Sequence, residues 1–172
     1  MGKELMWACA LLPEEVNQEI VTVCKRANKE IGLPETVFRF PLHISLKKSW
    51  ECDRFLDAQR DVAEYLKQSG RFSITTESPS LYKGMIWLPV KVDEKLKRVH
   101  VGLDALLEAK YGILRSEANL WFHPHISLFT GGDGKRMSAM QKILEKELSP
   151  ITAEIRRVVV GGAIHRDTFY QL

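Results

Sequence analysis

The stretch His43-Ile44-Ser45-Leu46 occurs a second time, letter for letter, as His125-Ile126-Ser127-Leu128, 82 positions further along a chain of 172 residues. Successive side chains of a β-strand point to opposite faces, so His and Ser share one face while Ile and Leu share the other. Each copy therefore predicts a strand with a polar pair on one face and an apolar pair directed into the core.

The segments around the two copies follow the same order. Each copy is preceded by a short apolar strand and an amphipathic helix, and each is followed by a second helix. The strands that carry the copies are predicted over Val37–Lys47 and Phe122–Phe129. An internal repeat whose halves cannot bury their own apolar faces predicts two lobes related by a pseudo-two-fold axis. We expect one domain over residues 1–172, with lobes near 1–84 and 85–172 that are able to exchange strands.

Composition is that of an ordinary soluble globular protein, with 45% apolar and 27% charged residues and a net charge of +3. No apolar run approaches the ~18 residues of a membrane span, so we expect no membrane contact. The three cysteines, Cys9, Cys24 and Cys52, are odd in number and widely spaced. That spacing fits neither a disulfide framework nor a metal clip, and it favours free thiols in a cytoplasmic protein. We also expect the protein to be a monomer.

Strand alternation turns two sets of side chains toward the cleft between the lobes. They are His43, Ser45 and Lys47 in the first half and His123, His125, Ser127 and Phe129 in the second. Two imidazoles with pKa values near ~6.5 can sit one protonated and one neutral, as concerted acid–base chemistry requires. Two hydroxyls can donate to the oxygens of a phosphate. The pattern predicts in-line displacement at phosphorus without a metal.

With these two motifs the chain resembles the 2H phosphoesterases, a superfamily that includes RNA 2′,3′-cyclic phosphodiesterases and the 2′–5′ RNA ligases. The hallmark of that superfamily is a pair of His-x-Ser/Thr motifs about 80 residues apart. The segments that carry the resemblance are the two His-Ile-Ser motifs, the lead-ins Arg39–Leu42 and Trp121–Pro124, Leu11–Glu14 and Met85–Leu88. The similarity covers nearly the whole chain.

The resemblance implies a bilobal α+β fold with antiparallel sheets lining a central cleft and helices packed outside. It implies that His43 and His125 act as acid and base, in either order, and that Ser45 and Ser127 hold the phosphate. The implied reaction is hydrolysis of a 2′,3′-cyclic or 2′–5′ phosphodiester, with no cofactor. The implied partners are RNA ends, oligonucleotides or small nucleotides.

Further residues are candidates for substrate binding, and His123 is one of them. Lys47 could assist an anionic phosphate, and Arg39 shares the strand parity of His43. Phe129, Trp87 and Tyr82 could stack on a nucleobase.

Three alternative functions fit parts of the sequence. His123 and His125 could chelate zinc together with His165 or Asp133, as in a metal-dependent phosphohydrolase. The cleft could bind RNA or a nucleotide without catalysis. The third alternative is a 2′–5′ RNA ligase-type activity. Activity that survives EDTA excludes the first, and a bell-shaped pH profile from two imidazoles excludes the second.

Overall fold

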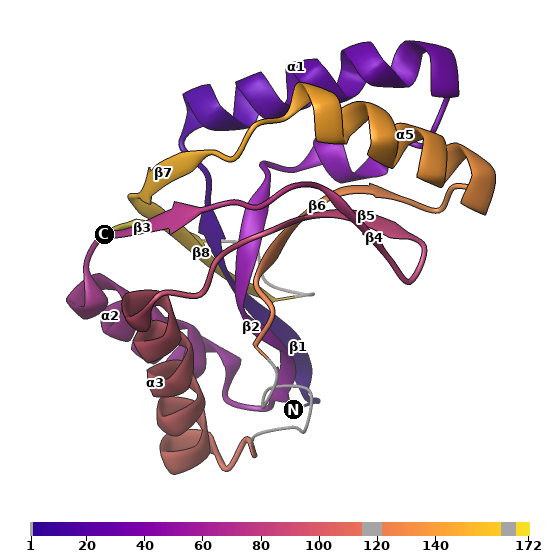
Figure 1. The fold of residues 1–172 in the computed structure, drawn as a ribbon. Helices are drawn as coiled ribbons and strands as arrows, with labels where there is room; N and C mark the ends of the chain where they lie inside the picture. Colours follow the sequence, from indigo (N-terminus) through magenta and orange to yellow (C-terminus); the bar gives the residue numbers. More distant parts are fainter. Residues whose placement is uncertain (1, 115–121, 163–167) are drawn as a thin grey trace.

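The computed structural model describes residues 2–114, 122–162 and 168–172, and it has an α+β fold with antiparallel sheets, as predicted (Figure 1). The strands are β1 (Glu4–Leu11), β2 (His43–Cys52), β3 (Phe72–Thr75), β4 (Ser80–Tyr82), β5 (Met85–Pro89), β6 (His125–Thr130), β7 (Thr152–Ile155), β8 (Arg157–Gly162) and β9 (Thr168–Gln171). The helices are α1 (Glu14–Ile31), α2 (Phe55–Ser69), α3 (Glu94–Tyr111) and α5 (Gly134–Glu147), with a 3₁₀ helix over Thr36–Arg39.

The strands form one four-stranded sheet and a second group of shorter ladders. The four-stranded sheet has the order β2-β1-β8-β9, so strands from the two ends of the chain pair directly. The second group consists of β4-β5-β6 and β3-β7, and a bridge between Thr76 and Val90 links these two ladders. Both strands that begin with the repeated motif, β2 and β6, lie at the edge of their sheets. They also contact each other, which brings the two motifs together.

The described α-helices form two pairs, each with one helix from either half of the chain. Figure 1 shows α1 beside α5 on one side of the strands and α2 beside α3 on the other. Helix α2 packs on β1 and β8, and α5 packs on β4 and β5. Gly32 and Gly112 end α1 and α3 with φ of 71° and 63°, a left-handed conformation that glycine adopts without a Cβ penalty. The order strand, helix, motif strand, helix, strand thus occurs twice.

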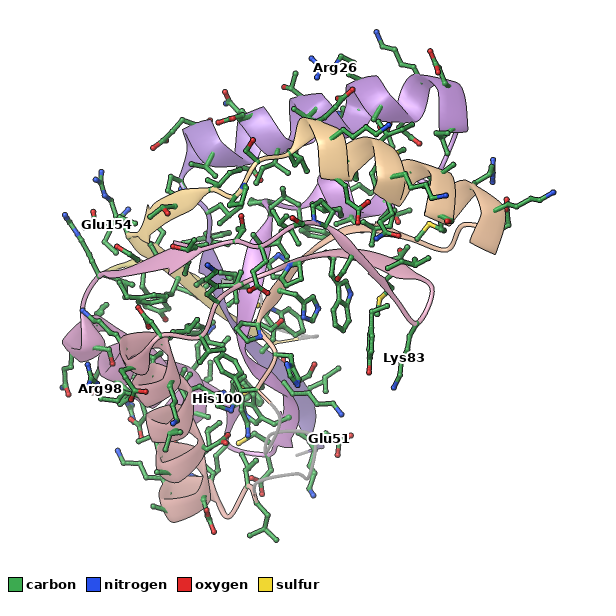
Figure 2. All side chains as sticks on the ribbon, viewed as in Figure 1. Arg26, Glu51, Lys83, Arg98, His100 and Glu154 are labelled. Carbon is green, nitrogen blue, oxygen red and sulfur yellow. The ribbon has the colours of Figure 1, made fainter. Side chains whose placement is uncertain are left out.

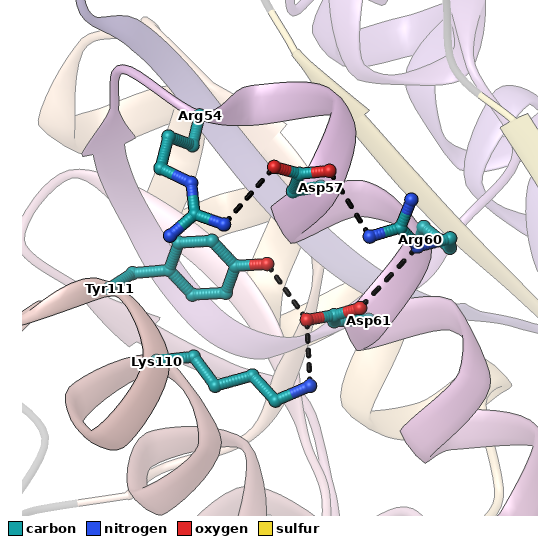
Figure 3. A network of polar contacts seen from close by, with 6 residues as sticks. All are labelled: Arg54, Asp57, Arg60, Asp61, Lys110 and Tyr111. Carbon is teal, nitrogen blue, oxygen red and sulfur yellow. Dashed lines mark hydrogen bonds and ion pairs between the residues drawn. The ribbon is translucent and has the colours of Figure 1, made fainter.

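A polar network joins α2 to the end of α3 (Figure 3). The Asp61 carboxylate accepts hydrogen bonds from Lys110 Nζ at 2.8 Å and Tyr111 Oη at 2.9 Å. These two bonds hold the pKa of Asp61 below its ordinary value. Burial, reinforced by the bond to Asp61, raises the pKa of Tyr111 to about 12. The network ties the two helices together.

The first motif strand starts later than predicted. Residues 36–39 form a 3₁₀ helix instead of the start of a strand, and β2 begins at His43. The nearby prolines explain the difference, because Pro34 and Pro41 lack the N–H that a ladder needs and Pro41 breaks the strand just before the motif.

Candidate active site

The two motifs open their strands in the same way, because His43 is the first residue of β2 and His125 is the first residue of β6. The apolar members of both motifs, Ile44, Leu46, Ile126 and Leu128, are completely buried in the main core, as alternation predicts. Their burial fixes both strands and leaves the histidines and serines on the opposite face, partly or fully exposed.

Both imidazoles are oriented by the same backbone contact. Nδ1 of His43 lies 3.0 Å from the carbonyl oxygen of Pro41, and Nδ1 of His125 lies 2.9 Å from that of His123. A carbonyl oxygen only accepts hydrogen bonds, so each Nδ1 carries the proton. The Nε2 atom of each ring is therefore the one available to give or take a proton.

Trp87 on β5 packs against His125. The two rings are stacked with centroids 3.7 Å apart and planes 12° apart. Tyr82 also packs on the indole, with centroids 4.6 Å apart and an interplanar angle of 37°. Stacking of Trp87 on a nucleobase stays a prediction, and in the structure its ring packs on these two neighbours. Tyr82 remains 46% exposed.

The environment lowers the pKa of His125. Burial is the main cause, and the positive charges of His43 and His123 add to it, while the bond to the His123 carbonyl partly opposes the shift. The effect of the His43 charge on the pKa of His125 agrees with the contact between β2 and β6. His125 consequently stays neutral to a lower pH than an ordinary histidine does.

A cavity of about 740 Å³ lies beside the two motifs, within the ~300–1,000 Å³ range of small-molecule sites. Its wall includes one member of each motif, Ser45 and His125. The other lining residues are Lys48, Ser49, Glu77, Ser80, Tyr82, Trp87, Pro89, Val90, Val92, His100, Phe122, His123 and Pro124. The predicted candidates His123, Trp87 and Tyr82 thus border one space, whereas His43 and Ser127 lie outside its lining.

A β-bulge in β2 overturns the predicted position of Lys47. Cys9 of β1 pairs with Ser45, but the next residue back, Ala8, pairs with Lys47, so Leu46 is an extra residue. Alternation is broken at this point, and Lys47 turns away from the cavity. Lys48 lines the cavity in its place.

An equivalent bulge in β6 overturns the predicted position of Phe129. Trp87 of β5 pairs with Ser127, whereas Ile86 pairs with Phe129, which leaves Leu128 as the extra residue. The two halves therefore share the bulge, at the residue after each His-x-Ser, as well as the motif.

The two displaced side chains find different partners in the interior. Lys47 is 3% exposed and forms a buried ion pair with Asp104 of α3. Phe129 is completely buried and packs edge-to-face on Phe38, with ring centroids 5.2 Å apart. Neither residue borders the cavity, so the structure gives no support to their predicted substrate contacts.

His100 is a cavity residue that the sequence reasoning missed. Figure 2 shows it on the side of α3 that faces the strands. Its Nδ1 lies 2.8 Å from the carbonyl oxygen of Leu46, the bulge residue, and its ring stacks on Phe122 at 3.9 Å. The signal was present, because His100 and Asp104 are polar residues four apart within the buried stripe of α3.

Arg39 lies at the end of the 3₁₀ helix, is exposed and does not line the cavity. The strand parity that placed it with His43 is wrong here, because residues 36–39 are not extended.

The zinc arrangement gains no support from the residues that the structure describes. Within residues 2–114, 122–162 and 168–172, no three His, Cys, Asp or Glu side chains are grouped as metal ligands would be. Asp133 caps α5 through Arg136 N and pairs with the Arg136 guanidinium at 2.7 Å. His165 lies outside the described residues.

A membrane-spanning helix is not found among the helices that the structure describes, since each is too short or too polar for one.

Solved structures with this fold cover almost the entire chain. Escherichia coli LigT complexed with 3′-AMP superimposes with a TM-score of 0.64 at 14% identity, over 99% of this chain and 95% of that one. Kluyveromyces marxianus Usb1 gives 0.60 at 11% identity, over 99% of both chains. The Thermus thermophilus protein TT0787 gives 0.59 at 14% identity, over 98% and 94%.

Comparison with curated protein sequences gave no match. Residues 13–162, which include both motifs, match the sequence profile of the 2′–5′ RNA ligase superfamily. Together with the paired motif strands, this match shows that the chain belongs to the 2′–5′ RNA ligase superfamily, whose members are 2H phosphoesterases.

Proposed function

We propose that the protein is a metal-independent phosphodiesterase that hydrolyses a 2′,3′-cyclic or 2′–5′ phosphodiester of RNA or of a nucleotide. The observation that carries this proposal is the matched orientation of two imidazoles, each held by an Nδ1 bond to the carbonyl two residues earlier. Two equivalent groups from equivalent strands suit a reaction that needs one acid and one base. The likeness to a LigT structure complexed with 3′-AMP is consistent with a nucleotide ligand.

The lowered pKa of His125 supports its role as the base. In this assignment Nε2 of His125 removes a proton from water as the water oxygen bonds to phosphorus. The bond from phosphorus to the ribose oxygen breaks, and that oxygen takes a proton from Nε2 of His43. The hydroxyls of Ser45 and Ser127 donate to the non-bridging oxygens. If the 5′-hydroxyl of a second RNA strand attacked phosphorus in place of water, the same step would join the two strands.

The proposal is tested by incubating the purified protein with 2′,3′-cyclic nucleotides and with 2′–5′- and 3′–5′-linked dinucleotides, with and without EDTA. We expect a phosphomonoester product and equal rates with and without the chelator. Loss of activity in EDTA that zinc restores would assign the site to metal-dependent hydrolysis. Binding without turnover between about pH 5 and 8 would assign it to a non-catalytic module.

Removal of either motif hydroxyl should weaken catalysis without abolishing it. We expect Ser45→Ala and Ser127→Ala each to lower kcat by about 10²-fold, the usual cost of one donor to a developing oxyanion. Steady-state kinetics on the best substrate measure the effect, and Ser69→Ala on α2 is the control, because its hydroxyl only bonds the Tyr65 carbonyl. An unchanged kcat in both motif variants would exclude the phosphate-binding role.

The pH profile of kcat/KM should report the lowered pKa of His125. The base must be neutral, so the rate falls as the pH drops through this pKa, and the acid limb should have its midpoint below the ordinary histidine value of 6.5. Rates measured across about pH 4–9 on a cyclic nucleotide give that midpoint. A midpoint above 6.5 would contradict the assignment of His125 as the base.

A further inference from the structure

The ladder registers arrange the cavity face of β4, β5 and β6 as two rows. In the first row His125 pairs with Pro89, and the Pro89 carbonyl accepts a hydrogen bond of 2.8 Å from Glu77 N. In the second row Ser127 pairs with Trp87, and Trp87 pairs with Ser80. Residues directly paired across strands share a face of the sheet. Glu77 and Ser80 therefore lie on the same face as the second motif.

Both rows run across the strands, from the second motif on β6 over β5 to Glu77 and Ser80. Neighbouring strands lie about 4.8 Å apart, so Glu77 and Ser80 stand about 10 Å from His125 and Ser127, two strand spacings away. Pro89 and Trp87 form the floor between the two ends. A nucleotide whose phosphate lies at the motif would place its ribose over this floor and its base edge at Glu77 and Ser80. All of these residues except Ser127 line the cavity.

Glu77 is an exposed carboxylate with an unused acceptor. Its backbone N–H bonds the Pro89 carbonyl, but its side chain makes no ion pair or hydrogen bond with any other residue that the structure describes. Glu154, by contrast, is an exposed strand carboxylate that pairs with Arg156 at 2.7 Å. An ionised carboxylate accepts hydrogen bonds only, and it has two oxygens for parallel N–H donors.

We propose that Glu77 and Ser80 read the base of the substrate and select guanine, an inference that rests on the proposed phosphodiesterase function. Guanine presents two adjacent donors, N1–H and the exocyclic amine, which match the two carboxylate oxygens, and its O6 can accept from the Ser80 hydroxyl. Adenine and cytosine have one exocyclic amine and, beside it, a ring nitrogen without a proton. The lone pair of that nitrogen is repelled by the carboxylate. Uracil flanks its one N–H with two carbonyl oxygens, which a carboxylate repels.

The inference is tested by the affinity of 3′-GMP, 3′-IMP and 3′-UMP for the wild type and Glu77→Gln, measured by calorimetry. We expect the wild type to bind 3′-GMP about 10- to 100-fold more tightly than 3′-UMP, since bonds to a charged acceptor carry that discrimination. Inosine lacks the exocyclic amine, so 3′-IMP should fall between them. Glu77→Gln should lose most of the guanine preference and leave the affinity for 3′-UMP within about 3-fold.

A matched control is Glu51→Gln, an exposed strand carboxylate outside the cavity lining, which should keep the guanine preference. Equal affinities for the three nucleotides in the wild type would overturn the inference, as would an equal loss for all three in Glu77→Gln. Binding does not require turnover, so the two proposals fail separately. Hydrolysis without base preference overturns only the role of Glu77, and guanine preference without hydrolysis overturns only the phosphodiesterase.

Discussion

Replacement of His125 by alanine is expected to lower kcat by about 10³-fold, and the same change at His43 is expected to have an effect of similar size. Each variant removes the Nε2 atom proposed as acid or base on its side of the phosphate, so either the proton of the attacking water or that of the leaving oxygen loses its proposed partner. The fold should survive, because both rings are partly exposed and the strands are held by Ile44 and Ile126.

The measurement is kcat on the best cyclic or 2′–5′-linked substrate, together with circular dichroism and a thermal melt for each variant. His123→Ala is the matched control. It removes a neighbouring imidazole but keeps the backbone carbonyl that orients His125, so its loss should stay within about 10-fold. A folded His43→Ala or His125→Ala variant that retains wild-type turnover would refute the proposed mechanism.

The second large effect concerns stability. Asp104→Ala leaves the Lys47 ammonium buried without its carboxylate, which should lower the free energy of unfolding by about 3–5 kcal/mol. The pair itself contributes much less than that, because both charges lose their hydration on burial. The double variant Lys47→Met with Asp104→Leu should therefore recover most of the loss.

Urea denaturation of the single and double variants measures these differences. Glu147→Ala breaks the exposed pair with Arg26, whose side chains are 35% and 62% accessible, and it should cost under about 1 kcal/mol. If Asp104→Ala is no more destabilising than Glu147→Ala, the buried ion pair does not hold α3 to β2 in the way the structure indicates.

The buried ion pair and the face that carries the first motif depend on the same bulge. Leu46 is the extra residue that turns Lys47 inward, and its carbonyl bonds His100 of α3. Ser45, directly before the bulge, stays on the cavity side. In the other half the bulge at Leu128 likewise turns Phe129 inward, but there the inward side chain packs on Phe38. One backbone feature thus supports both motifs with different interior chemistry.

The α+β class and the two motif strands could be predicted from residue spacing. Alternation is a local property of an extended chain, so the burial of Ile44, Leu46, Ile126 and Leu128 followed from their spacing alone. Alternation breaks down one residue later in each strand, so a prediction from alternation was wrong there. It placed Lys47 and Phe129 beside the cavity, because a single strand does not reveal that its neighbour pairs with fewer residues over the same length.

The side chains that lie beside the motifs could not be predicted from spacing, because they come from distant segments of the chain. Three features depend on contacts between segments far apart in the chain. Lys48 lines the cavity where Lys47 was predicted. Trp87 stacks on His125, and His100 lies beside the bulge in β2. Glu77 belongs to the same group, since strand pairing sets it two strands from His125. The physical reason is that a motif fixes the chemistry of its own residues, whereas register and packing between strands and helices fix their neighbours.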